Sequence, residues 1–228
     1  MVYETEIKEK QEMRKQSIKE SAILVILFAP VVFMLFVWNK LPESLPVHWN
    51  IRGEIDGYGP KYLFPLMSIA LYVIFIMIPK IDPRKRNYTI FSATYYKLRL
   101  ILTLFMSMFI SVVIINSLYV RIQFERLIPA SVLLLLAAIG NYLGTVRSNF
   151  FIGIRTPWTL DNEEVWRKTH LLGGRIWFFG GITGALAALF FPHPFSEYFA
   201  LGCVVLMVIV PVLYSYFCFR NLEKARTV

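Results

Sequence analysis

Residues 98–120 read LRLILTLFMSMFISVVIINSLYV, and Arg99 is the one charged side chain among them. The run exceeds the ~20 residues that a helix needs to cross a hydrocarbon core ~30 Å thick. Polar and apolar residues do not alternate along it, which argues against a strand of a membrane barrel. A membrane-spanning helix is therefore predicted for this stretch.

Five further windows have similar length and composition: 21–38, 62–79, 127–146, 174–191 and 197–219. The whole chain agrees with them, because 57% of its 228 residues are hydrophobic, only 17% are charged and the mean hydropathy is +0.55. A soluble protein of this length could not bury so much apolar surface. The predicted fold class is an all-α, multi-pass membrane protein with six transmembrane helices.

The distribution of positive charge predicts the orientation. Lys and Arg residues number 19 on the side that holds both termini, against 5 on the other side. Cytoplasmic segments carry the excess of these residues in membrane proteins. The amino and carboxyl termini are therefore both predicted to lie in the cytoplasm.

The windows divide the chain into three predicted parts. Residues 1–20 are a charged cytoplasmic segment, residues 21–97 an N-terminal membrane domain, and residues 98–228 a C-terminal membrane domain. Two connections are longer than neighbouring helices require, an outer loop at 39–61 and a cytoplasmic loop at 147–173. Long loops usually carry function, so we expect the functional residues there.

The composition weighs against several function classes. Central parts of the windows contain no Asp, Glu, Lys, Arg or His, whereas a proton- or ion-coupled pump normally needs buried ionisable groups. The chain has no nucleophile motif, phosphate loop or metal-binding cluster, and Cys203 and Cys218 lie too far apart on one helix to bridge. We predict no enzyme activity, no catalytic residue, no metal and no cofactor. Because the net charge of +9 is spread over short clusters between spans, direct nucleic-acid binding is not expected either.

The outer loop contains LPESLPVHWNIRGEIDGYGP at residues 41–60. Two extended runs flank a turn near residues 50–53, and Asp56-Gly57 is a second turn signal, so a compact hairpin-like cap is predicted. His48 has two interpretations, a ligand or a packed side chain that hydrogen-bonds its own loop. The second is favoured, because the metal roles of histidine need partner ligands and none lies nearby in the sequence.

The inner loop is rich in aromatic and charged residues from 149 to 170. Asp161 is predicted to cap a helix on which Trp166 and His170 share one face. One interpretation is an interfacial helix anchored by Trp166 that leads into the fifth span, with the membrane lipid as its partner. The other is a docking surface for a cytoplasmic partner, made of Arg155, Trp158 and Trp166, because Arg and Trp often dominate interfaces.

Small residues and one proline predict features inside the membrane. Gly140 and Gly144 on one helix, and Gly180 and Gly184 on another, are spaced for close approach to a neighbouring helix. Pro211 cannot donate to the carbonyl four residues before it, so it should kink the last span.

Both long loops resemble one family, the SdpI family of bacterial and archaeal multi-pass membrane proteins. The outer segment is similar to P-x-H-x-N-x-x-G, the core of that family's N-terminal domain of unknown function. The inner segment is similar to its N-x-x-x-G-x-R-T-P-W and W-x-x-x-H signature. The outer site residues are His48, Asn50, Gly53, Asp56 and Gly57. The inner site residues are Asn149, Gly153, Arg155, Thr156, Pro157, Trp158, Asn162, Trp166 and His170.

The resemblance implies a membrane immunity protein in a prokaryotic cell membrane. Members of the family protect against a hydrophobic peptide toxin, and signalling follows when the loaded protein sequesters a cytoplasmic transcriptional repressor. An outer cap above an apolar helical groove suits such a receptor. The alternative is a small-solute or lipid transporter, which a liposome flux assay would separate from a receptor. A third class is an intramembrane enzyme, which metal binding by His48 or His170 would favour.

Overall fold

The computed structural model describes residues 2–50, 52, 54–119, 124–192 and 194–226. The first part of the chain forms α1 (Val2–Phe36), the 3-10 turn η1 (Trp38–Lys40), β1 (Ser44–Trp49), β2 (Ile55–Pro60), α2 (Leu63–Ile81), α3 (Lys85–Ile90) and α4 (Ser92–Leu118). The second part forms α5 (Phe124–Leu143), α6 (Pro157–Asp161), α7 (Glu163–Phe190) and α8 (Phe195–Arg226).

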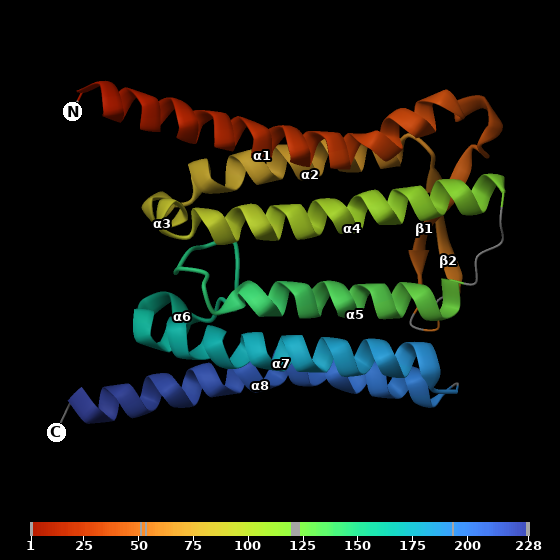
Figure 1. Ribbon diagram of the computed structural model, residues 1–228. Coiled ribbons are helices and arrows are strands. Elements are labelled where there is room, and N and C mark those ends of the chain that lie inside the picture. The colour runs from red at the N-terminus through yellow and green to blue at the C-terminus, as the bar shows by residue number, and fades with distance from the viewer. Residues whose placement is uncertain (1, 51, 53, 120–123, 193, 227–228) are drawn as a thin grey trace.

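Among the described residues six helices are long and apolar enough to cross a membrane, which confirms the predicted number of spans. They are α1, α2, α4, α5, α7 and α8. The helices lie roughly side by side, and both termini emerge at the end that also holds α3 and α6, while β1 and β2 lie at the opposite end (Figure 1). We call these the inner end and the outer end, following the predicted orientation.

The spans form two groups. One contains α1, α2 and α4, and the other contains α5, α7 and α8 (Figure 1). Helix α4 packs more extensively on α1 than on α5. The domain boundary that the sequence suggested at residue 97 falls within α4.

Two helices extend further than the apolar windows. Helix α1 begins at Val2, so residues 2–20 of the charged segment are helical and continuous with the first span. Helix α7 has 28 residues, about 42 Å at 1.5 Å per residue. It includes both the predicted interfacial helix and the fifth span without a break, because nothing between Glu163 and Phe190 interrupts its backbone hydrogen bonds.

Small residues let α5 and α7 approach closely, as predicted for Gly140, but the facing residue is Gly174, and the predicted Gly180 lies against Met207 of α8 instead. A Cβ added at Gly140 would lie 2.9 Å from the carbonyl oxygen of Gly174, and one added at Gly174 would lie 2.7 Å from the carbonyl oxygen of Gly140. Real Cβ atoms do not approach a backbone that closely. The two backbones therefore meet where neither residue has a side chain.

Prolines inside two spans each leave a carbonyl without its usual helical donor, and an aromatic side chain of another helix supplies one. Trp177 Nε1 of α7 donates to the Met207 carbonyl at 2.9 Å, four residues before Pro211. The Tyr95 hydroxyl of α4 donates to the Phe75 carbonyl, four residues before Pro79. Since lipid offers no hydrogen-bond donor to replace water, these side chains stabilise the broken turns.

We expect Trp177→Phe to lower the unfolding free energy by about 1 kcal/mol, the usual range for a hydrogen bond between membrane helices. In a Pro211→Ala background the same change should cost less, because residue 211 can then donate to Met207 itself. A double-mutant cycle of unfolding in detergent measures the difference. Equal costs in both backgrounds would show that the Trp177 hydrogen bond does not compensate for Pro211.

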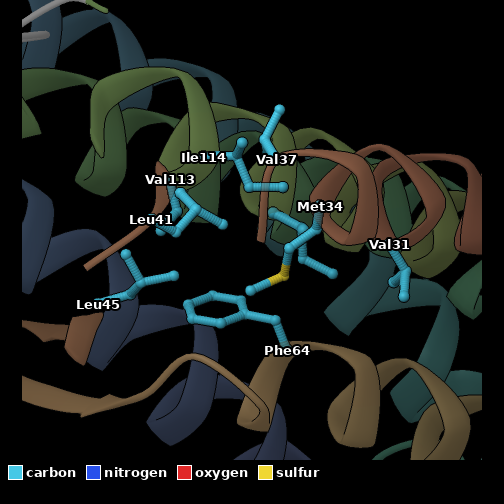
Figure 2. Packing of buried hydrophobic residues seen from close by; sticks show 9 residues of the cluster. Val31, Met34, Val37, Leu41, Leu45, Phe64, Val113 and Ile114 are labelled. Carbon is cyan, nitrogen blue, oxygen red and sulfur yellow. The ribbon is translucent and has the colours of Figure 1, made fainter. Parts of the chain in front are cut away.

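The outer loop forms a two-stranded antiparallel ribbon, β1 with β2, above the end of α1 and α4. Its inward side chain Leu45 is 1% exposed and belongs to a cluster with Met34 of α1, Phe64 of α2 and Ile114 of α4 (Figure 2). Trp49 also packs edge-on against Phe109 of α4, with ring centroids 5.3 Å apart. The ribbon is therefore packed onto the helices on one side.

Candidate functional site

The inner loop turns around the side chain of Asn149, which is fully buried. Its Oδ1 accepts hydrogen bonds from the backbone N–H groups of Phe151 (2.9 Å) and Ile152 (2.6 Å). Its Nδ2 donates to the carbonyls of Arg147 (2.8 Å) and Ile152 (3.0 Å). One buried side chain thus satisfies both donors and acceptors of the turn, which is a task for an amide and not for a carboxylate.

A second buried polar side chain, Asp82, comes from the end of α2. It is 1% exposed. Asp82 accepts from the backbone N–H of Arg84 at 2.7 Å, from that of Phe150 at 2.9 Å, and from the Tyr88 hydroxyl at 3.0 Å. The same hydroxyl lies 3.2 Å from Asn149 Oδ1. Asp82 and Tyr88 therefore connect the α2–α3 segment directly to the turn around Asn149.

The Tyr88 hydroxyl remains protonated in this cluster. Burial raises the pKa of Tyr88 well above its usual value, and the hydrogen bond to Asp82 raises it further. The neutral phenol of Tyr88 can donate its proton in a hydrogen bond to the Asp82 carboxylate. A phenolate would be repelled by the same carboxylate, so the neutral form is favoured. Tyr88 is thus a fixed donor between two acceptors.

Two more side chains of the α2–α3 segment form hydrogen bonds with the inner loop. Arg84 donates to the Leu160 carbonyl at 2.7 Å and to the Ser148 hydroxyl, and its guanidinium lies 5.0 Å from the centre of the Phe150 ring. Asn87 Nδ2 donates to the Ser148 carbonyl at 2.6 Å. We refer to Asp82, Arg84, Asn87 and Tyr88 as the inner clasp, because together they hold residues 148–160 against the first helix group.

His170 and Trp166 form the other wall of the turn. Their rings stack 4.0 Å apart, Trp166 is 3% exposed and His170 is fully buried. His170 Nε2 accepts from the Ile154 N–H at 2.9 Å, and Nδ1 lies 2.8 Å from the Trp166 carbonyl. These partners require a neutral imidazole with its proton on Nδ1. Both nitrogens are engaged, so His170 is part of the packing and does not offer a lone pair.

Gly153 passes directly over the His170 ring. Its φ is +119°, and a Cβ added there would collide with His170 Nε2. Both observations require glycine, because other residues rarely adopt this backbone conformation and none would fit above the ring. Gly153 therefore allows the loop to close onto His170.

Local capping explains the two helices that follow. Thr156 caps α6 by accepting from the Thr159 N–H at 3.2 Å, and its hydroxyl lies 3.1 Å from that of Ser215 on α8. Asn162 caps α7 by accepting from the N–H groups of Glu164 (2.9 Å) and Val165 (3.1 Å). The predicted cap at Asp161 was wrong by one residue, since Asp161 ends α6 instead. Asp161 and Asn162 are both residue types that cap helices well, so the sequence could not show which of the two caps α7.

The surface of the inner loop differs from the predicted docking surface. Arg155 is exposed, Pro157 is exposed, and half-buried Trp158 packs edge-on against Tyr216 of α8 at 5.0 Å. Trp166, in contrast, points inward and donates through Nε1 to the Val146 carbonyl at 2.8 Å. Trp166 therefore contributes to the interior, and only Arg155 and Trp158 of the three residues remain accessible to a partner.

The outer site residues lie on the ribbon. The side chain of His48 is 70% exposed, so the prediction that it is packed was wrong. The predicted hydrogen bond to its own loop is present, with Asp56 as the partner. Asn50 closes the turn by accepting from the N–H groups of Arg52 and Glu54. Asp56 and Gly57 lie within β2 at an irregularity in the register and not in a second turn. Gly53 lies outside the described residues.

Sequence reasoning missed the inner clasp. A signal was present, because Asp82 is the one acidic residue among six Lys and Arg from 80 to 99 and is followed by Pro83, which favours a helix end. The loop it binds lies more than 60 residues further along the chain. The contact between Asp82 and the inner loop could therefore not be inferred from the spacing of residues in the sequence.

Fold and site together define a class: a six-span membrane protein with a packed ribbon at one end and a clasped polar loop at the other. Residues 145–215 match the SdpI/YfhL protein family, and residues 25–71 match a domain of unknown function (DUF1648). The immunity protein SdpI of Bacillus subtilis (strain 168) is 23% identical over 206 residues, which cover 89% of this chain and 97% of that protein. No solved structure matches the chain.

The predicted resemblance to the SdpI family is thereby confirmed, together with a multi-pass location in the cell membrane. The matched segments divide between the two helix groups. One covers the last third of α1, the ribbon and the first half of α2, and the other covers the inner loop, α6, α7 and about two thirds of α8.

Proposed function

We propose that this chain is a membrane immunity protein that binds a hydrophobic toxin peptide from outside the cell and signals its occupancy to a cytoplasmic transcriptional repressor. The observation that carries the proposal is the similarity to an immunity protein over nearly the whole length of both chains. The two segments that match family models, residues 25–71 and 145–215, contain the ribbon and the inner loop, which supports a functional role for both loops.

The route from the outer end to the inner end supports a signalling role. Lys61, two residues before the start of α2, is 5% exposed and donates to the Trp38 carbonyl (3.1 Å) and to Glu43 (3.0 Å). Its ammonium also lies 4.8 Å from the centre of the Trp38 ring. At the other end of α2, Asp82 binds the inner loop. A shift of the ribbon would therefore be carried by one helix to the inner clasp.

The inner surface offers a place where such a shift can be sensed. Arg155 and Trp158 are accessible, and they project from the loop that the inner clasp holds. A partner that binds one position of this loop better than another would respond to toxin occupancy. We assign Arg155 and Trp158 to partner binding and assign Asn149, Gly153, Trp166 and His170 to the support of that loop.

Survival of bacteria tests the proposal. Cells that express the chain should survive a hydrophobic toxin peptide that kills the parent strain, and the peptide should co-purify with the protein from membranes. Trp49→Ala, which removes the contact between the ribbon and Phe109, should reduce survival, whereas Gly202→Ala, with no atom near the added Cβ, should not. Failure to protect against any of a panel of such peptides, at verified membrane expression, would contradict an immunity function.

A further inference from the structure

A cavity of about 890 Å³ lies at the inner end between the two helix groups. Its walls come from α3 and the start of α4 on one side, and from residues 144–148 after α5 and the start of α7 on the other. The residues that carry the argument are Ile90, Arg147, Glu163, Arg167 and Leu171. The volume is within the range of small-molecule sites in proteins, roughly 300 to 1,000 Å³.

The cavity lies at the depth of the lipid head groups. Helix α7 is about 42 Å long, some 12 Å more than a hydrocarbon core, so its first turns extend beyond the acyl chains. These turns carry Glu163 and Arg167, whereas the apolar part of the helix begins after Arg175. A ligand in this cavity therefore meets the membrane at the level of phosphates and amines.

Charges of both signs line the cavity without neutralising each other. Within the described part of the chain, Arg147, Arg167 and Glu163 belong to no ion pair, and Glu163 is joined to neither arginine. Glu164, in contrast, is paired with Lys168 at 2.8 Å. The cavity thus presents two free guanidinium groups and one free carboxylate.

We propose that this cavity binds the head group of a phospholipid that carries both a phosphodiester and a primary ammonium, as in phosphatidylethanolamine. Guanidinium groups bind phosphate oxygens through paired N–H donors, which suits Arg147 and Arg167. The Glu163 carboxylate accepts N–H donors from an ammonium. A purely anionic head group would satisfy the arginines but leave Glu163 with a like charge nearby.

The rim of the cavity suits the rest of the lipid. Ile90 is 65% exposed and Leu171 is 42% exposed, and both are apolar side chains on its border. In water such exposure would be unfavourable, whereas acyl chains leaving the head group would cover it. The ligand therefore combines a zwitterionic group inside the cavity with apolar chains at its edge.

Titration with short-chain lipids tests the proposal. The purified protein in detergent is titrated with dioctanoyl phosphatidylethanolamine, phosphatidylcholine or phosphatidylglycerol, and binding is read from the thermal midpoint. We expect the strongest binding for phosphatidylethanolamine, because the quaternary amine of phosphatidylcholine has no N–H and phosphatidylglycerol has no cation. Glycerophosphoethanolamine, the same head group without acyl chains, should bind more weakly and distinguishes a lipid from a soluble phosphate ester.

Variants assign the binding to the cavity. Arg147→Gln with Arg167→Gln should weaken phosphatidylethanolamine binding about tenfold or more. Glu163→Gln should retain binding but abolish the preference over phosphatidylcholine. The control, Lys85→Gln with Arg86→Gln, removes the same charge from exposed residues of α3 outside the cavity.

Size-exclusion profiles establish that each variant is folded. Equal binding of the three lipids by the unmodified protein, or equal losses in the cavity variant and the control, would overturn the assignment. The assay needs neither toxin nor repressor, so its outcome is independent of the proposed immunity function.

Discussion

Replacing Gly153 by alanine is expected to lower the unfolding free energy by about 3 kcal/mol or more. Two costs coincide, a backbone with φ of +119° that alanine rarely adopts and a Cβ that collides with His170 Nε2. His170 cannot move aside without losing its stack on Trp166 and its hydrogen bond from Ile154. The inner loop would therefore detach from α7.

Unfolding in a mild detergent, followed by thermal or chemical titration, measures this effect. Gly202→Ala is the matched control, because a Cβ at Gly202 meets nothing within 4 Å and its helical position favours alanine. Its unfolding free energy should equal that of the parent or exceed it by up to about 1 kcal/mol. Similar stabilities of the two variants would show that the loop does not close onto His170 as described.

The second large effect concerns signalling. Arg155→Ala with Trp158→Ala should weaken recruitment of a cytoplasmic repressor about 100-fold while toxin resistance is retained. The physical reason is that bound peptide is sequestered whether or not the inner surface is sensed, whereas a signal needs the partner to contact that surface. Loss of two interface anchors of these types commonly costs a few kcal/mol.

A survival assay and a membrane-recruitment assay are compared at equal amounts of protein in the membrane. Arg86→Ala is the control, because it removes an exposed arginine from the same end but from α3. Since Trp158 packs on Tyr216, the thermal midpoint of the double variant must be measured as well. If resistance and recruitment fall together in a folded protein, Arg155 and Trp158 act through the structure of the loop and not as a partner surface.

The inner clasp bears on both predictions, because it holds the loop that contains Gly153 and Arg155. Asp82 and Tyr88 hold the loop that presents Arg155, although they come from the other helix group. The Tyr88 hydroxyl, with its pKa raised by burial, keeps its proton and donates to Asp82, and it also lies 3.2 Å from Asn149 Oδ1. The clasp is thus the polar contact through which α2 reaches the inner loop.

Some properties follow from the sequence alone because they depend on neighbouring residues. Six apolar windows of about 20 residues predict six spans, since the length of a helix and the thickness of a bilayer are both fixed. The charge distribution predicts an orientation, and Pro211 identifies a carbonyl that loses its helical donor. The ordered inner motif, from Asn149 to His170, indicated the family before any fold was known.

Other properties depend on which distant residues meet, and only the tertiary structure decided them. The sequence identified the carbonyl left by Pro211 but not Trp177 as its donor, and it identified Asn149 but not Tyr88 and Asp82 as its partners. Trp166 has the composition of an interface residue, yet it is buried because its indole N–H finds the Val146 carbonyl 20 positions away. The physical reason is the same in each case: hydropathy and capping act over a few residues, whereas a buried polar group takes the nearest partner in space.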